Sequence, residues 1–321
     1  MDRIAYVFPG QGSQSVGMGK ALVAASPAAK AVLAEADDAL GESISALAFD
    51  GPEEQLNLTV NSQPALVAVS IAFLAAMRER WAAAGVAEPT PAYVAGHSMG
   101  QYSALVAAGS ISLADAVRLV RERGRQMQAS GQGRQGAMAA IIGLDDARIP
   151  DLLALGAGLG SVAVANRNSP GQIVISGDRA AVAAAANGAK ELGARRGLVL
   201  PVSVAAHSSL MAEAAEGMTK VLAPIEFAEP KIPLIANADA RPITTAAAAR
   251  GELIEHLTRG VDWVAAVQRM TTDGVTMFVE IGSGKVLTGL VKRIAPEATA
   301  FATDEASAPG GIAVPFSTAT N

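Results

Sequence analysis

The stretch that decides the fold is AYVA at residues 92–95, followed by GHSMG at 96–100 and QYSALVA at 101–107. An apolar run, a glycine-flanked turn and a second apolar run predict a strand, a sharp turn and a helix. The glycines let the backbone fold tightly and push the Ser98 hydroxyl outward, while the Met99 amide faces whatever that hydroxyl attacks. The motif therefore predicts a nucleophilic serine, which needs a base to activate it.

The composition is that of a globular protein. The chain has 321 residues, of which 50% are hydrophobic and 17% are charged, and its net charge is −5. A nucleic-acid partner is not expected, because binding phosphates needs a basic face. The chain has no cysteine, which excludes disulfides, thiolate zinc sites and cysteine nucleophiles. We expect no metal site.

No membrane segment is expected either. The apolar part of residues 1–9 is too short for a signal peptide, and no run approaches the ~20 apolar residues of a membrane span. We therefore expect a cytoplasmic protein that does not associate with membranes.

Apolar periodicity predicts strands that alternate with helices, which is typical of an α/β fold with a mainly parallel sheet. The predicted strands are 4–8, 92–95, 137–143, 161–165, 172–176, 198–204, 232–235 and 277–281. A helix is predicted soon after the glycine-rich loop at 9–14, and another follows the serine turn at 101–107. The other predicted helices are 27–40, 64–84, 113–129, 145–154, 179–192, 208–222, 254–258 and 264–273.

The middle of the chain has a pattern of its own. Residues 131–201 read β-α-β-β-α-β, the order of a ferredoxin-like motif, and glycines lie at their start. We interpret them as a small subdomain inserted into a larger domain formed by residues 1–130 and 202–302. Residues 303–321 are rich in alanine, serine, glycine and threonine, which indicates a flexible tail.

Ligands of parallel sheets bind beyond the carboxyl ends of the strands. Gln11, Ser98 and the turn at Gly282 each follow a predicted strand, so they are expected to share one cleft. Backbone amides of the glycine-rich loop at 9–14 suit an oxyanion-binding role beside Met99, although a simple tight turn is equally consistent with it. The loop lacks the sequence of a nucleotide-binding P-loop.

The base must be sought among three histidines. His97 neighbours Ser98 in sequence, so its side chain should point away and pack against the turn. His207 follows a predicted strand and opens a helix, which makes it the candidate base. His256 is expected on a solvated helix face. A third group that orients the base is not apparent, because the nearest aspartates fall in the inserted piece, and a backbone carbonyl is the alternative.

Charged residues give weaker signals. Arg123 lies in the run LVRERGR at 119–125. By residue type alone, an arginine in such a run more often lies in solvent than in a site.

Several blocks of sequence, taken in order, resemble one family. They are PGQGSQ at 9–14, GHSMGQYSA at 96–104, GAMAA at 136–140, NRNSPGQ at 166–172, PVSVAAH at 201–207 and EIGSGKVL at 280–287. The chain resembles the malonyl-CoA:acyl carrier protein transacylases of bacterial type II fatty-acid synthesis over roughly residues 3 to 295.

The resemblance implies a hydrolase-like α/β domain with a ferredoxin-like insertion. It implies Ser98 as nucleophile, His207 as base, and the backbone amides of Gln11 and Met99 as the oxyanion hole. The malonate-binding arginine of the family falls on Arg123. The implied reaction moves a malonyl group from malonyl-CoA to acyl carrier protein through a malonyl-serine, without a cofactor and in a monomer.

The same resemblance places a main-chain carbonyl near His256, where it would orient the base. The family often has leucine and glutamate where Met99 and Gln101 stand, serine where Ala206 stands, and glutamine or asparagine where His256 stands. Ala206 leaves the tolerance for other acyl groups open.

Three substrate-binding residues are more tentative: Asn166, Arg195 and Arg196. The two arginines suit CoA phosphates or an acidic carrier protein, although a solvated turn explains them nearly as well. Other functions also stay open. A serine hydrolase or thioesterase would use the same serine and histidine, a sister acyltransferase would serve polyketide synthesis or malonate decarboxylation, and an inactive scaffold would have lost at least one of these residues.

Overall fold

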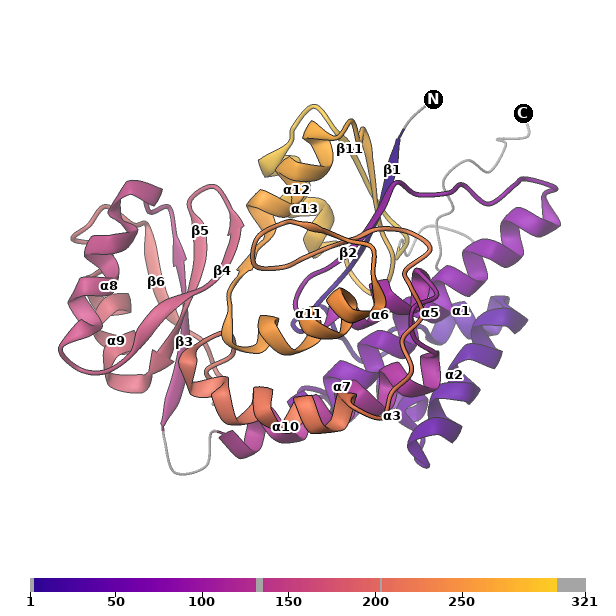
Figure 1. Cartoon of the computed structure of the whole chain (residues 1–321), viewed down its shortest axis with the longest axis horizontal. Helices are drawn as coiled ribbons and strands as arrows, with labels where there is room; N and C mark the ends of the chain where they lie inside the picture. Colours follow the sequence, from indigo (N-terminus) through magenta and orange to yellow (C-terminus); the bar gives the residue numbers. More distant parts are fainter. Residues whose placement is uncertain (1–2, 131–134, 203, 305–321) are drawn as a thin grey trace.

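The computed structural model describes residues 3–130, 135–202 and 204–304, and these form a mixed α/β fold with two β-sheets (Figure 1). The strands of the first sheet lie in the order β11-β10-β1-β2-β7-β8. Their bounds are Ile4–Phe8 for β1, Tyr93–Gly96 for β2, Leu234–Ile235 for β7, Pro242–Ile243 for β8, Met277–Glu280 for β10 and Thr299–Ala302 for β11. All neighbours pair in parallel except β7 and β8, which confirms the mainly parallel sheet.

Strand β1 lies between β10 and β2, and helices cover both faces of the sheet. Ala5 and Val7 pack into one hydrophobic cluster, whereas Tyr6 and Phe8 pack into another on the opposite face. This explains why the segment is a continuous apolar run, since a parallel strand is buried on both sides. Because β10, β1 and β2 pair in parallel, their carboxyl ends lie at the same edge of the sheet.

The helices match most of the predicted ranges. They are α1 Lys20–Ala25, α2 Pro27–Leu40, α3 Ile44–Asp50, α4 Glu53–Leu56, α5 Thr59–Ala83, α6 Gly100–Ala107, α7 Leu113–Ser130, α8 Ile149–Ala157, α9 Arg179–Gly188, α10 Ala212–Leu222, α11 Ala246–Thr258, α12 Trp263–Thr272 and α13 Val286–Ile294. Short 3-10 turns, Asp146–Arg148 and Ser209–Met211, precede α8 and α10. Helices α3, α4 and α13 were not predicted.

Helix α5 corrects one expectation. By length and composition alone it could cross a membrane, contrary to the prediction that no run approaches that length, but 83% of its apolar window is buried inside the protein. It packs against α2 and α7. The helix also begins at Thr59 and not at Pro64, so this proline lies inside the helix as its sixth residue, where its missing N–H leaves one i→i−4 hydrogen bond unmade.

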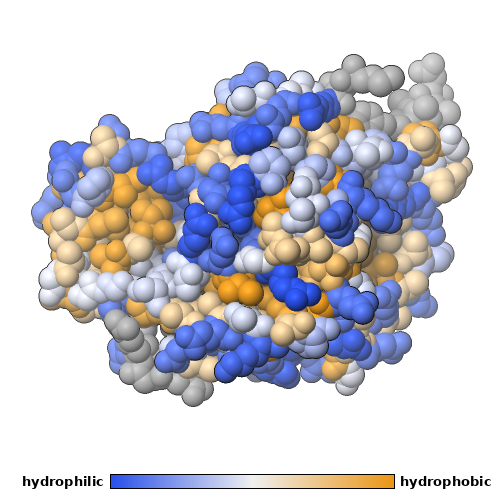
Figure 2. All heavy atoms as spheres, in the orientation of Figure 1, coloured by the Kyte–Doolittle hydropathy of each residue, from blue (hydrophilic) through white to orange (hydrophobic). Residues whose placement is uncertain are grey.

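The second sheet has the order β6-β3-β5-β4-β9. Its strands are β3 Gly136–Ile142, β4 Val162–Ser169, β5 Gln172–Asp178, β6 Arg196–Val199 and β9 Val261–Asp262. The β6-β3, β3-β5 and β5-β4 pairs are antiparallel. Figure 2 shows hydrophobic surface gathered over this part of the molecule, where Leu159 and Leu198 are exposed.

Two boundaries of this region differ from the prediction. Strand β6 begins and ends earlier than the predicted strand 198–204. Strand β9 was not predicted, and it joins the second sheet although it follows the range 131–201 by about sixty residues in sequence; it pairs in parallel with β4. Two residues are too few to give a strand pattern.

The chain beyond the predicted boundary at 303 is held at its start. The side chain of Thr303 accepts a hydrogen bond from the Gly282 amide at 3.2 Å, and that of Asp304 accepts one from the Gly284 amide at 2.7 Å. Strand β11, which was not predicted, delivers both residues to this turn. The expected flexibility of residues 305–321 lies outside the described residues.

Candidate active site

Ser98 sits in a strained turn between β2 and α6, with a φ of 52°. A non-glycine residue in this region persists only where the surroundings impose it, and such strain is common at active sites. Gly96 and Gly100 must be glycines because there is no room for a side chain at either position. A Cβ at Gly96 would lie 1.9 Å from the carbonyl carbon of Gly100, and one at Gly100 would lie 2.3 Å from the Phe8 oxygen.

The loop that follows β1 lies directly against this turn. A Cβ at Gly10 would meet the His97 carbonyl oxygen at 2.5 Å. The backbone amides of Gln11 and Met99 therefore come from two adjacent turns at the same sheet edge. Across residues 3–130, 135–202 and 204–304, neither amide donates a hydrogen bond, which leaves both available to an oxyanion. The Gly282 turn lies against the same loop, since a Cβ at Gly282 would be 2.9 Å from Pro9 Cγ.

His207 reaches the serine. Its Nε2 lies 2.8 Å from Ser98 Oγ, and its Nδ1 lies 2.5 Å from the His256 carbonyl oxygen and 3.2 Å from that of Arg259. Because a carbonyl only accepts, Nδ1 carries the proton and Nε2 is free to take one from the serine. His207 also has a positive φ of 59°.

The electrostatics keep this imidazole neutral. Burial, followed by the nearby charge of Arg123, lowers the pKa of His207 to about 3, and the bond to the His256 carbonyl opposes that shift. A neutral imidazole at physiological pH is the form that can act as a base.

His256 is not on a solvated face, as the sequence had suggested. It is fully buried, and the edge of its ring faces Tyr102 at a centroid distance of 6.3 Å. Burial lowers its pKa well below the usual value, with smaller contributions from the charges of Arg123 and His207. What it offers the site is its backbone carbonyl.

Arg123 comes from α7 and is only 1% exposed. Its Nη1 donates to Gln63 Oε1 at 2.9 Å and its Nη2 donates to Ser98 Oγ at 3.1 Å, while its Nε has no hydrogen-bond partner among residues 3–130, 135–202 and 204–304. Within the described residues no carboxylate pairs with it. Burial lowers its pKa to about 10, so the guanidinium still carries its charge at neutral pH. A buried cation without a counter-ion is costly unless an anion binds it.

His97 packs beside the turn, as predicted from its place next to the serine. Its ring lies 5.7 Å from that of Trp263, and its Nε2 lies 2.9 Å from Asn168 Oδ1 on β4. It makes no hydrogen bond to the Ser98 hydroxyl among the described contacts. Its contact with Asn168 instead ties the serine turn to the second sheet.

The tentative residues are not joined to Ser98 by any described contact. Asn166 is buried on β4, opposite Val261, whereas Arg195 and Arg196 are exposed at the start of β6, the edge strand farthest from β9. A cavity of about 300 Å³ is lined by residues of β4 and β9, among them Ala165 and Val261, and by Arg259. Arg259 is also the residue whose carbonyl oxygen lies 3.2 Å from His207 Nδ1.

Two residues of the site were not anticipated. Gln63 holds Arg123, and Asn237 accepts a hydrogen bond from the Ser98 amide at 2.8 Å. Nothing in the local sequence of either marks it, because each contacts its partner across 60 or more residues of chain.

The arrangement suits one kind of chemistry. It combines a strained serine, a neutral histidine in contact with it, two free amides and a buried cation. Such a site can transfer an acyl group through an acyl-serine, and the cation selects an acyl group that carries a negative charge.

Comparisons with known proteins agree with that chemistry. The acyl transferase domain family matches residues 5–307. The malonyl CoA-acyl carrier protein transacylase of Escherichia coli (strain K12) is 46% identical over 308 residues, 96% of this chain and 98% of the relative. The acyl-carrier-protein-S-malonyltransferase of Bartonella henselae superposes with a TM-score of 0.90 at 43% identity, covering 95% of this chain and 96% of that one. A malonyl-transacylase solved with its type II polyketide acyl-carrier protein gives 0.88 at 44% identity, covering 94% and 95%.

Proposed function

The chain belongs to the acyl transferase family, among the malonyl CoA-acyl carrier protein transacylases, and we propose that Ser98, His207 and Arg123 carry out its reaction. It is an acyltransferase that moves the malonyl group of malonyl-CoA onto acyl carrier protein for fatty-acid synthesis. The observation that supports our assignment of residues is the buried Arg123 guanidinium, which lies 3.1 Å from the Ser98 hydroxyl and has no carboxylate partner in the part of the chain that the structure describes.

The first half-reaction forms the acyl-enzyme. His207 Nε2 takes the proton of the Ser98 hydroxyl as Oγ attacks the thioester carbonyl of malonyl-CoA. The resulting oxyanion is held by the Gln11 and Met99 amides, and one such donor is worth about 2.7–4 kcal/mol. The C–S bond then breaks, CoA leaves with the proton that His207 had taken, and malonyl-Ser98 remains.

The second half-reaction runs the same chemistry in reverse. The phosphopantetheine thiol of acyl carrier protein gives its proton to His207 and attacks the malonyl ester. The C–O bond breaks and the proton returns to Ser98 Oγ. The malonyl carboxylate stays paired with Arg123 through both steps, because a planar guanidinium offers it two parallel hydrogen bonds. No cofactor enters either step as proposed.

Intact-protein mass spectrometry tests these assignments. The protein is mixed with malonyl-CoA or with acetyl-CoA, and Ser98→Ala serves as the control. We expect a stable gain of one malonyl group from malonyl-CoA alone, absent in the variant and discharged by added acyl carrier protein. Free CoA that accumulates without an adduct would instead indicate a hydrolase.

The pH profile of kcat/KM gives a first prediction. This quantity reports the free enzyme, in which the pKa of His207 is lowered to about 3 from its usual 6.5. Because the neutral form is the base, activity should persist as the pH falls through 6.5 and decline only at more acidic values. Arg123→Gln should move that acidic decline toward 6.5, since it removes the second cause of the shift. A decline centred at 6.5 in the unmodified protein would contradict a buried, neutral base.

Replacing His256 gives a second prediction. The base is oriented by the backbone carbonyl of this residue, so His256→Gln should lower kcat by less than about tenfold, far less than the roughly 10⁴-fold effect of losing an orienting side chain in other triads. Steady-state malonyl transfer measures it, with a thermal melt of the same variant as the control. A loss comparable to that of His207→Ala would show that the imidazole itself participates.

We further propose a finer description of the architecture. The strand order β6-β3-β5-β4, with α8 and α9 packed against it, supports a ferredoxin-like subdomain over residues 131–201. The strained serine turn between β2 and α6 supports a hydrolase-like larger domain over 1–130 and 202–302. Strand β9 adds a strand to the smaller sheet from the larger domain.

We also propose roles for three further residues, together with a location and an oligomeric state. Arg195 and Arg196 would meet CoA phosphates or the acidic carrier protein, as their exposure permits. Asn166, which lies on β4 near the cavity, would contact substrate. We also propose a cytoplasmic monomer that binds neither nucleic acid nor membranes.

A polyketide carrier protein is a second candidate acceptor. A solved relative of similar structure is a malonyl-transacylase bound to a type II polyketide acyl-carrier protein. Offering the malonyl-enzyme a fatty-acid carrier and a polyketide carrier in competition distinguishes the two. We expect the fatty-acid carrier to be loaded faster.

A further inference from the structure

The serine turn is clamped by an asparagine from outside the motif. Asn237 follows β7, the neighbour of β2. Its Oδ1 accepts a hydrogen bond from the Ser98 amide at 2.8 Å, and its Nδ2 donates to the Gly96 carbonyl at 2.7 Å. One side chain therefore bridges both sides of a turn that is strained at the serine. Because the clamp contacts only backbone, it sets where the hydroxyl points without touching it.

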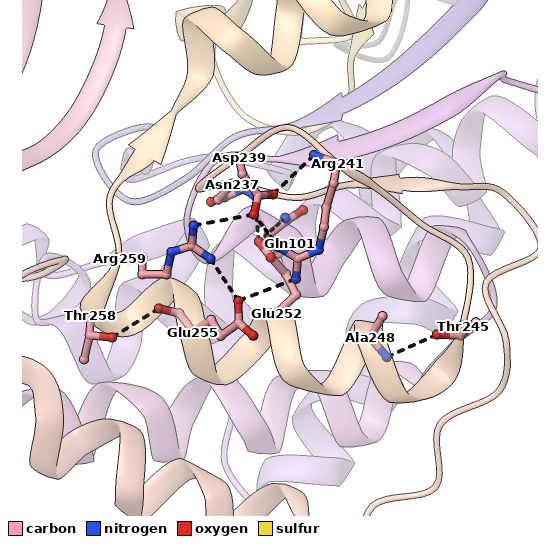
Figure 3. Close-up of polar contacts among 10 residues, drawn as sticks. All are labelled: Gln101, Asn237, Asp239, Arg241, Thr245, Ala248, Glu252, Glu255, Thr258 and Arg259. Atoms are coloured by element: carbon pink, nitrogen blue, oxygen red, sulfur yellow. Dashed lines mark hydrogen bonds and ion pairs between the residues drawn. The ribbon is translucent and has the colours of Figure 1, made fainter.

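The clamp is held by a buried carboxylate. Glu252, on α11, is 1% exposed. Its Oε1 accepts hydrogen bonds from the backbone N–H of Asn237 at 2.7 Å and from Gln101 Nε2 at 2.9 Å. Gln101 Oε1 in turn accepts from the Gly96 amide at 3.0 Å. The contacts thus form a closed circuit around the turn, and Figure 3 shows Gln101, Asn237 and Glu252 side by side above α11.

The same helix supports the base. His256 follows Glu252 by four residues, one helical turn, and its carbonyl oxygen lies 2.5 Å from His207 Nδ1. Helix α11 is therefore linked to the nucleophile turn by Glu252, acting through Asn237 and Gln101, and it contacts the base through the His256 carbonyl. A shift of α11 would displace both the serine turn and His207, and so would change the distance between Ser98 Oγ and His207 Nε2.

We propose that Glu252 is a positioning residue for acyl transfer: it fixes α11 against the serine turn and so sets the Ser98–His207 distance. This rests on the proposed function of Ser98 and His207.

The hydrogen bonds that Glu252 accepts explain why a side chain with an oxygen acceptor lies here. Within the described part of the chain, Glu252 forms no ion pair, and the nearby Arg241 is paired with Asp239 at 2.6 Å. A buried carboxylate without a cation is retained only where hydrogen bonds compensate for its burial. Here both donors converge on one of its two oxygens, so an oxygen acceptor at this place is what the circuit requires.

The first test replaces that acceptor. Glu252→Ala should lower the rate constant of Ser98 acylation at saturating malonyl-CoA on the order of 10- to 100-fold while KM changes little, because a misplacement of about 1 Å has effects of that size. Glu252→Gln keeps an oxygen acceptor and should restore most of the rate. Glu213→Ala is the control, since Glu213 is an exposed glutamate on the neighbouring helix α10.

Exchanging the side chains of Gln101 and Glu252 tests these hydrogen bonds without leaving a cavity. Gln101→Glu alone would set two carboxylates at the present 2.9 Å contact and should slow acylation strongly. Adding Glu252→Gln restores one donor and one acceptor between these two residues but not the hydrogen bond from Gln101 Nε2 to the Ile235 carbonyl, so the double variant should be faster than Gln101→Glu and slower than the unmodified protein. Equal rates in the single and double variants would overturn the proposal, as would a folded Glu252→Ala protein that acylates at the normal rate.

A second readout separates this inference from the proposed function. A fluorophosphonate labels an activated serine without malonyl-CoA, so its rate of reaction with Ser98 reports the Ser98–His207 pair alone. If the unmodified protein forms no malonyl adduct, the proposed function fails. A labelling rate that still falls in Glu252→Ala and recovers in Glu252→Gln would nevertheless support the positioning role, and a labelling rate that is the same in all three proteins would refute it.

Discussion

Replacing Ser98 by alanine should lower malonyl transfer on the order of 10⁵- to 10⁶-fold. The variant lacks the only atom that lies both 2.8 Å from the base and 3.1 Å from the Arg123 guanidinium within the described structure. Without Oγ there is no covalent intermediate, and the carrier thiol must attack malonyl-CoA directly. Transfer of radiolabelled malonyl to acyl carrier protein measures the loss over this range.

A double variant makes that prediction sharper. His207→Ala should be nearly as inactive as Ser98→Ala, and the combination should be no worse than Ser98→Ala alone, because residues that act as a unit have non-additive effects. Binding of malonyl-CoA should survive in all three proteins, since Arg123 is untouched. Additive losses would mean that the two residues act in separate steps, which their 2.8 Å contact does not suggest.

The nucleophile and the base could be predicted from sequence because their signals are local or scarce. The glycines around Ser98 mark its turn directly, and the chain offers few histidines from which to choose. Arg123 carried a signal that residue type alone does not show. It continues the buried face of α7, after Ala116 and Val120 and before Met127, and a charged residue on such a face needs a partner.

The supports of the site could not be predicted in this way. Asn237 bonds to Ser98 across 139 residues, and only the pairing of β2 with β7 brings them together. On α11, His256 stands between Glu255 and Leu257, a position that in the sequence suggests a solvated helix face. Helix α11 packs against α10 and α6, which buries Glu252 and His256 and leaves Glu255 46% exposed, and the hydrogen bonds that Glu252 accepts compensate for its own burial.

Replacing Arg123 by alanine should reduce kcat/KM for malonyl-CoA on the order of 10²- to 10³-fold, the effect of about 3–4 kcal/mol lost with a buried ion pair. Acetyl-CoA has no carboxylate and should be affected far less, so the preference for malonyl over acetyl should narrow. Arg123→Lys keeps the charge but loses the planar fork, and an intermediate rate is expected.

The acetyl donor is what separates two roles of Arg123. Its Nη2 also donates to Ser98 Oγ, so a variant could act merely by displacing the nucleophile. Displacement would slow malonyl and acetyl transfer equally and leave the preference unchanged, which would refute the carboxylate-binding role. The assay is best run well above pH 6.5, because losing this cation also raises the pKa of His207. Arg125→Ala is the matched control: it lies on the same helix, its side chain is 64% exposed and it pairs with Glu122, so both rates and their ratio should be unchanged.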